Sequence, residues 1–164
     1  MSRQLHLKRK YSYRANGRSI VLVKKSIESE AHVLMKAFLW ALYGARYPGI
    51  QVEIPIEDRY KPDLVAFPEP KHPHDPPLFW GEAGKVSASK MAKILKQYPH
   101  THFAFARWNG PTKPYRIMAE QCLRKHPHPA PIDILTFNEE TVAHFIADDG
   151  QISLGWEDVR WERI

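Results

Sequence analysis

Two short apolar segments of this sequence each carry one acidic residue. Asp63 lies in residues 60–67 (YKPDLVAF), and Glu82 lies in residues 78–85 (LFWGEAGK). Both segments have the composition of β-strands. A carboxylate inside an apolar strand is unfavourable unless it is paired, hydrated or bound to a metal. Two such acids on successive strands therefore indicate a shared site.

Side-chain alternation predicts how the two acids are directed. A period of two residues puts Asp63 on the same strand face as Val65, and Glu82 on the same face as Trp80. If the strands are antiparallel neighbours, the carboxylates converge and can share a metal ion through oxygen ligands at about 2.1 Å. The alternative is that Asp63 is a residue of the strand edge, paired with Arg59 or Lys61.

A third acid is expected from a helix that precedes these strands. The sequence predicts a helix over about residues 27–45, with Ser26 as its N-cap. Glu30 continues the apolar stripe of Leu34 and Ala37 on this helix, so we predict that its carboxylate points along the buried face. The alternative is that an acid here only favours the helix dipole, by about 0.3–1 kcal/mol, a role that Glu28 fits better.

The lysine that would assist these acids has two candidates. In an unbroken strand Lys85 points away from Glu82, unless a bulge at Gly84 turns it inward. Lys90 borders the apolar stripe of a second predicted helix, residues 87–98, and can reach the site from there. Lys93 of the same helix is predicted to face solvent or phosphate.

These motifs resemble those of the PD-(D/E)xK phosphodiesterases, in which Pro-Asp on one strand and an acid with a nearby lysine on the next hold a divalent metal. The similarity is greater to the YaeQ-like branch, over residues 26–108: an acid-bearing helix start (Ser29-Glu30), Pro62-Asp63-Leu64, Glu82-Ala83-Gly84 and a basic helix follow in order. The resemblance implies a restriction-endonuclease-like fold, with Mg²⁺ or Mn²⁺ held by Glu30, Asp63, Glu82 and the backbone carbonyl of Ala83. It also implies that Lys85 or Lys90 orients or activates water, with Asp63 and Glu82 as the catalytic acids.

The charge balance favours a polyanionic partner. The chain has 24 Lys and Arg against 18 Asp and Glu, a net charge of +6 and a pI near 9.4. Eight basic residues and no acid occur in the first 25 residues. We expect DNA or RNA to contact Lys8, Arg9, Lys10 and Arg14, together with Lys93.

Other features of the sequence indicate in which cellular compartment the protein is expected. Cys122 is the only cysteine, so no internal disulfide can form and a reducing compartment is expected. The N-terminus lacks the apolar run of a signal peptide, and the most apolar stretch, residues 32–45, is shorter than the roughly 20 residues of a membrane span. We expect a cytoplasmic protein without a membrane partner, with a homodimer as an open alternative to a monomer.

The pattern of elements predicts one α/β (α+β) domain over residues 1–164. Strands are expected at 4–14 and 18–25, joined as a hairpin by Asn16-Gly17, then at 50–56, 61–67, 78–84, 102–108 and 131–137, with one or two more at 151–161. Helices are expected at 27–45, 87–98, 114–124 and 138–146. This order predicts a central mixed sheet flanked by helices, with an N-terminal β-hairpin.

Three functions follow from these observations. The first is metal-dependent hydrolysis of phosphodiesters in nucleic acid, and the second is a catalytically inactive nuclease fold that binds nucleic acid. The third is a metal-binding interaction protein, because Lys-His-Pro-His occurs at both 71–74 and 125–128. Structural zinc sites normally need four ligands, so surface loops stiffened by proline explain these repeats better.

Overall fold

The computed structural model describes residues 9–164. Along the chain its elements are β1 (Arg9–Ala15), β2 (Arg18–Lys24), α2 (Glu30–Tyr43), β3 (Gln51–Val52), β4 (Leu64–Ala66), β5 (Phe79–Ala83), α3 (Ala88–Gln97), β6 (His102–Trp108), α4 (Lys113–Lys125), β7 (Ile132–Phe137), α5 (Glu139–Phe145), a short 3₁₀ helix (Trp156–Asp158) and β8 (Arg160–Arg163). Six strands form one mixed sheet in the order β3-β4-β5-β6-β7-β8, in which β5, β6 and β7 are parallel and the other neighbours antiparallel. None of the helices between residues 9 and 164 has both the length and the hydropathy to cross a bilayer.

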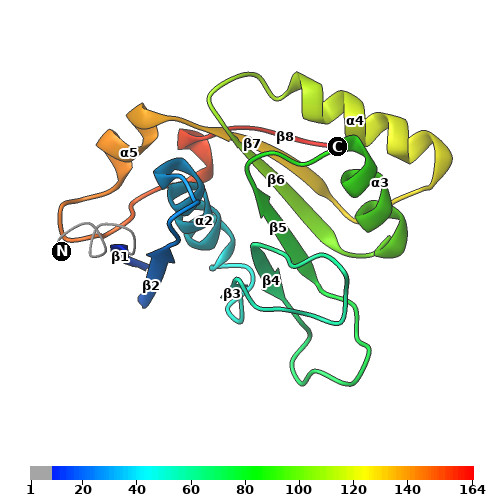
Figure 1. The fold of residues 1–164 in the computed structure, drawn as a ribbon, viewed down its shortest axis with the longest axis horizontal. Helices are drawn as coiled ribbons and strands as arrows, with labels where there is room; N and C mark the ends of the chain where they lie inside the picture. Colours follow the sequence, from blue (N-terminus) through cyan, green and yellow to red (C-terminus); the bar gives the residue numbers. More distant parts are fainter. Residues whose placement is uncertain (1–8) are drawn as a thin grey trace.

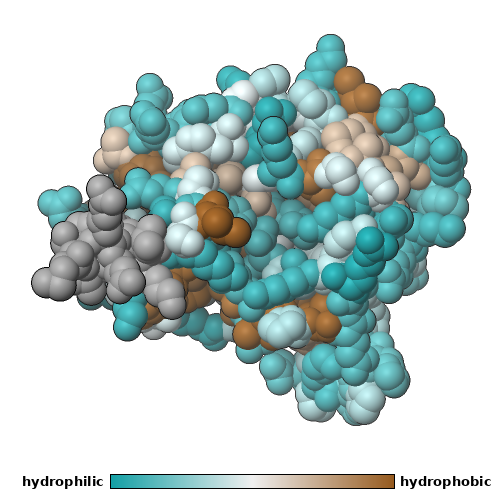
Figure 2. Space-filling view, viewed as in Figure 1, coloured by the Kyte–Doolittle hydropathy of each residue, from teal (hydrophilic) through white to brown (hydrophobic). Residues whose placement is uncertain are grey.

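The sheet separates two apolar layers. On one face α2 packs against β4, β5 and β6, with the β1–β2 hairpin on its outer side; on the other face lie α3 and α4 (Figure 1). Strand β6 shows how the sequence produces this division. Its Ala104 and Ala106 face α2, where small side chains let a helix approach closely, whereas Phe103 and Phe105 face α3 and α4. The surface seen in Figure 2 is mostly hydrophilic, with separate apolar patches.

The hairpin turn forms as its sequence predicts. Asn16 and Gly17 have φ angles of 55° and 72°, the positive values that a two-residue turn of type I′ needs at both positions. The hairpin pairs Arg9 with Lys24 through Ala15 with Arg18. The predicted strand residues 4–8 lie outside the described part of the chain.

Helix α2 begins three residues later than the sequence predicts. Ser29, not Ser26, is its N-cap, and the Ser29 Oγ accepts from the His32 amide at 3.1 Å. Residues Lys25 to Glu28 instead form a turn, in which the Glu28 amide donates to the Lys25 carbonyl. From Met35 to Tyr43 every residue of α2 is buried, because the sheet covers one side of the helix and the hairpin the other. A helix buried all round has no single inward stripe, so the Leu34–Ala37 stripe does not define the direction of Glu30.

Most other elements lie close to their predicted positions. Strand β6 spans the predicted 102–108, and α3 spans 88–97 against a predicted 87–98. The predicted strands at 50–56 and 61–67 are shorter, as β3 and β4, because both edges of this region run into proline-containing loops. The predicted final strand at 151–161 is replaced by an isolated bridge at Ile152, the 3₁₀ helix and β8.

A buried carboxylate fixes the C-terminal end of α2 to the sheet. Asp133 of β7 is fully buried. Its carboxylate accepts hydrogen bonds from Tyr43 of α2 at 2.7 Å and from Arg163 of β8 at 2.8 Å, and it lies 2.7 Å from His102 Nε2. Burial opposes the charge, but these hydrogen bonds hold the pKa of Asp133 below its ordinary value. The cluster lies at the amino ends of β6 and β7, away from the carboxyl end of β5.

Candidate functional site

The antiparallel pairing of β4 with β5 brings Asp63 and Glu82 together. Leu64 pairs with Gly81, and the Asp63 amide donates to the Gly81 carbonyl at 3.1 Å, so Asp63 lies opposite Glu82 at the carboxyl end of β5. Asp63 itself lies just before β4. The Asp63 Oδ2 accepts from the Ala83 amide at 2.8 Å, which fixes this carboxylate to the end of β5.

Glu82 is held on the side of the sheet that faces α3. Its Oε1 accepts from Trp80 Nε1 at 2.8 Å and lies 2.9 Å from Lys90 Nζ. Burial, followed by the negative charge of Asp63, raises the pKa of Glu82 to about 7, although Lys90 and Trp80 act in the opposite direction. Glu82 can therefore gain or lose a proton near neutral pH.

Asp63 is held by α2, on the other side of the sheet. His32 Nε2 lies 3.5 Å from Asp63 Oδ1. Burial opposes ionisation of Asp63, but His32 and the Ala83 amide hold the pKa of this carboxyl below its ordinary value. The same contact, together with Glu28, raises the pKa of His32. The charge of Asp63 acts on Glu82, but the side-chain partners of the two acids come from opposite layers. The hydrogen bonds therefore differ from the predicted convergence of both carboxylates on one strand face, because Asp63 lies just before β4 and is fixed by the Ala83 amide and by His32.

Behind Asp63 lies a buried ion network made of Glu28, His32, Lys36 and Glu53. The Lys36 side chain is 1% exposed, and its Nζ lies 2.5 Å from Glu28 Oε2 and 2.7 Å from Glu53 Oε1. Glu28 also contacts His32 Nδ1. Burial disfavours the ammonium, yet the two carboxylates hold the pKa of Lys36 above its ordinary value. Burial likewise opposes ionisation of Glu28, but its hydrogen bonds, first that from Lys36, hold its pKa below the ordinary value.

Glu30 contacts the hairpin, so the prediction that its carboxylate points along the buried face of the helix is wrong. It is exposed, and its Oε1 accepts from the Tyr11 hydroxyl of the hairpin at 3.0 Å. Glu28, which was expected only to favour the helix dipole, is the acid that reaches inward. It does so because it precedes Ser29, outside the helix, and its carboxylate can fold back over the first turn.

The two candidate lysines have different environments. Strand β5 ends at Ala83, and Gly84 adopts a φ of 92°, so the chain leaves the strand before Lys85. Lys85 is exposed. Lys90 is partly buried and contacts Glu82, and its amine lies 5.3 Å from the centre of the Tyr60 ring. Of the two, Lys90 is the lysine paired with a candidate acid.

The predicted nucleic-acid contacts are dispersed. Lys10 is exposed on β1, Arg14 contacts Asp149 at 2.5 Å, and Lys93 is exposed on α3. Lys8 lies outside the described residues, and Arg9 begins β1. A cavity of about 590 Å³ beside Asp63 carries three further exposed lysines, Lys25, Lys61 and Lys85, at its lining. Lys25 and Lys61 were not expected to contribute to the site.

The His-Pro-His repeats do not form a common site. His74 contacts Glu57 at 3.0 Å, whereas His128 lies 2.9 Å from the Ala130 carbonyl and 3.0 Å from that of Tyr98. Within residues 9–164 no group of three or more His, Cys, Asp or Glu side chains is arranged as a metal cluster. A metal at Asp63 and Glu82 would therefore take its remaining ligands from the backbone or from solvent.

The buried ion network had a signal in the sequence. Glu28, His32 and Lys36 follow one another at a spacing of four residues, which puts polar groups on one side of an otherwise apolar segment. Three polar residues at this spacing in a helix that must be buried predict a paired network. Glu53 had no such signal, because its contact with Lys36 depends on the fold.

We predict that the Glu82 carboxyl titrates near pH 7 in the folded protein. Replacement of Asp63 by asparagine removes the nearby negative charge. Burial then remains as the influence that raises the pKa of Glu82, while Lys90 and Trp80 lower it, so this pKa should fall toward its ordinary value. Side-chain ¹³C NMR of glutamate-labelled protein, with Glu82→Gln to assign the signal, measures this. A wild-type midpoint near 4.3 would contradict the prediction.

We predict that Lys36→Met lowers the free energy of unfolding at pH 7 by about 3–5 kcal/mol, because it leaves the buried carboxylate of Glu28 and the partly buried one of Glu53 without their cation. Ionised Glu28 stabilises the fold at pH values above the pKa that this carboxyl has in the unfolded chain. The contribution is lost as the pH falls through the lower pKa that Glu28 has in the folded protein. The difference in the free energy of unfolding between Lys36→Met and the wild type should therefore become smaller at acidic pH. Urea unfolding at several pH values measures it, with exposed Lys85→Met as the control; equal losses in both variants would contradict the prediction.

Comparisons with solved structures include two YaeQ proteins. That of Pseudomonas syringae matches with a TM-score of 0.63 and 13% sequence identity, covering 96% of this chain and 96% of that chain. That of Xanthomonas axonopodis pv. citri matches with a TM-score of 0.55 and 13% identity, covering 79% of this chain and 73% of that chain. No protein-family model matches the sequence, and no curated protein matches it significantly. The wider PD-(D/E)xK relationship stays a prediction, and the chain shares the fold of the YaeQ proteins.

Proposed function

We propose that this protein hydrolyses phosphodiester bonds of nucleic acid with the help of Mg²⁺ or Mn²⁺. The observation that carries the proposal is the contact of Lys90 Nζ with Glu82 Oε1 at 2.9 Å. This contact brings a lysine of the following helix beside the strand acid, in keeping with the acid and nearby lysine of the motif that the sequence resembles. An acid pair with an adjacent lysine, of which Asp63 lines a cavity that also carries lysines, is a set of groups suited to this chemistry.

The residues present fit a hard divalent cation. Asp63, Glu82 and the backbone carbonyl of Ala83 would hold the metal, and oxygen donors are those that Mg²⁺ and Mn²⁺ prefer. Burial and then the charge of Asp63 raise the pKa of Glu82, and a bound cation would favour the ionised form of this carboxyl. When bound, such a metal lowers the pKa of water and neutralises charge on the phosphate.

The protein's own groups would position and charge the site. His32 and the Ala83 amide keep Asp63 ionised and oriented. Lys90 places a positive charge beside Glu82, where it can orient the attacking water, and the Tyr60 ring limits the directions available to the amine. The exposed amines of Lys25, Lys61 and Lys85 would attract the phosphate backbone to the cavity.

A second function, binding of nucleic acid without catalysis, is favoured by one observation. Asp63 and Glu82 each have a basic partner within the chain, His32 and Lys90, so the site is largely neutralised by the protein itself. In this case the basic hairpin and the cavity lysines would hold phosphates by charge.

We predict that Lys90→Ala lowers turnover of nucleic acid by at least about 100-fold, the scale of a lost proton-transfer or charge-stabilising group. Lys85→Ala, an exposed lysine without a carboxylate contact, should lower it by less than about tenfold through weaker phosphate binding. The assay is hydrolysis of mixed single- and double-stranded DNA and RNA with Mn²⁺. Asp63→Asn serves as the inactive control.

Full activity in both lysine variants would remove lysine-assisted hydrolysis from the proposal. An inactive wild type that still binds the same substrates, with an affinity that falls as salt rises, would favour the binding function instead.

A further inference from the structure

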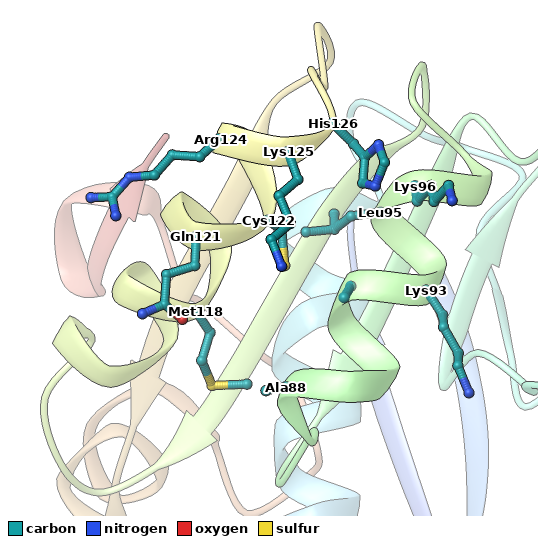
Figure 3. A pocket seen from close by; sticks show the side chains of 11 residues that line it. Ala88, Lys93, Leu95, Lys96, Met118, Gln121, Cys122, Arg124, Lys125 and His126 are labelled. Atoms are coloured by element: carbon teal, nitrogen blue, oxygen red, sulfur yellow. The ribbon is translucent and has the colours of Figure 1, made fainter.

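Helices α3 and α4 enclose a groove on their outer side, with a cavity of about 560 Å³. Its floor is apolar and includes Ala92, Leu95, Met118 and Cys122. In Figure 3 the Cys122 and Leu95 side chains point toward each other across the groove, and Met118 points toward Ala88 at its other end.

The groove is elongated along both helices. On α3 its lining extends from Ala88 to Lys96, and on α4 from Met118 to His126, each a rise of about 12 Å. The helices run side by side in the same direction, because each connects a pair of parallel strands. A groove about two helical turns long between two helices has the shape that accepts a third helix.

The rim of the groove is basic. Lys93 and Lys96 lie on α3, Arg124 and Lys125 on α4, and all four are exposed. The groove lining contains no acidic residue. Apolar floor and basic rim together complement a segment with one apolar face and acidic flanks.

The groove is separate from the candidate catalytic site. It lies on the outer side of α3 and α4, whereas the cavity beside Asp63 is lined by α2 and the loops that follow β2 and β5. On α3, Lys90 is directed to Glu82, while Ala92 and Lys96 line the groove. Occupation of the groove therefore leaves the cavity beside Asp63 open.

We propose that this groove docks an acidic amphipathic helix of a partner protein. Apolar side chains of that helix would cover Leu95, Met118 and Cys122, and the small Ala88 and Ala92 would let its backbone approach α3 closely. Its carboxylates would pair with the basic residues of the rim. In Figure 3 Lys125 extends along the groove, whereas Arg124 and Lys93 point outward and would turn toward the bound helix. The mainly apolar floor favours a peptide over a nucleic-acid backbone, which would leave that floor uncovered.

The test uses the full chain and designed fluorescein-labelled peptides of about 18 residues, about 27 Å long as helices. One peptide carries leucine at spacings of three and four residues with glutamate elsewhere; a second replaces leucine by glutamine, and a third replaces glutamate by lysine. Fluorescence anisotropy measures binding. Because Cys122 is the only cysteine and lines the groove, its rate of alkylation by iodoacetamide locates the bound peptide.

The proposal expects saturable binding of the first peptide alone, with slower alkylation of Cys122. Ala92→Glu should weaken binding at least about tenfold, because it puts a like charge against the acidic helix, while Ser89→Glu, outside the groove lining on the same helix, should leave it unchanged. Nuclease or nucleic-acid-binding activity should be the same in all three proteins, which separates this test from that of the proposed function. Absence of binding, equal binding of the glutamine peptide, or an unchanged alkylation rate of Cys122 would overturn the proposal. It would also be overturned if a duplex oligonucleotide displaced the peptide and if Ala92→Glu weakened the binding of that oligonucleotide.

Discussion

The buried ammonium of Lys36 is the constraint on which the site depends. Inside a helix that is covered on all sides, this charge is tolerated only because Glu28 and Glu53 lie within 2.7 Å of it. Glu28 comes from the turn before α2, and Glu53 from the residue after β3. Glu53 adopts a φ of 56° and its amide donates to the Asp63 carbonyl at 2.8 Å, so the residue that neutralises Lys36 also holds the segment that carries Asp63. One buried cation thus ties together the start of α2, the edge of the sheet and one candidate acid.

The site lies where the two layers of the protein meet, at the carboxyl end of β5. Side-chain alternation directs Glu82 with Trp80 toward α3, while Asp63 reaches α2 through His32. The Ala83 amide joins them, because it donates to Asp63 one residue after Glu82. This arrangement lets two acids lie close together while one is held ionised and the other has a pKa of about 7. A pair of carboxylates with unequal proton affinity is typical of sites that hold metals or move protons.

Local signals in the sequence predicted much of this structure. The burial of individual residues and the contacts between distant residues could not be predicted in this way. The Asn16-Gly17 turn and strand β6 depend on neighbouring residues, and they were correctly predicted. Of the two candidate lysines that the sequence leaves open, Lys90 contacts Glu82. The direction of Glu30 was predicted wrongly because Ser26 and Ser29 can both cap a helix, and a shift of three residues changes which acid folds inward. The spacing of Glu28, His32 and Lys36 indicates a paired group on this helix, but the second partner of Lys36, Glu53, is 17 residues away and its contact depends on the fold.

The proposal that Asp63 and Glu82 form a cation site can be tested by calorimetric titration of Mn²⁺ into the purified protein. One ion should bind per chain, and binding should be lost in Asp63→Asn and in Glu82→Gln but retained in Glu30→Gln, since Glu30 contacts the hairpin. Protons should be released on binding near pH 7, because the metal requires the ionised form of Glu82. Equal binding in all four proteins, or none in the wild type, would contradict it.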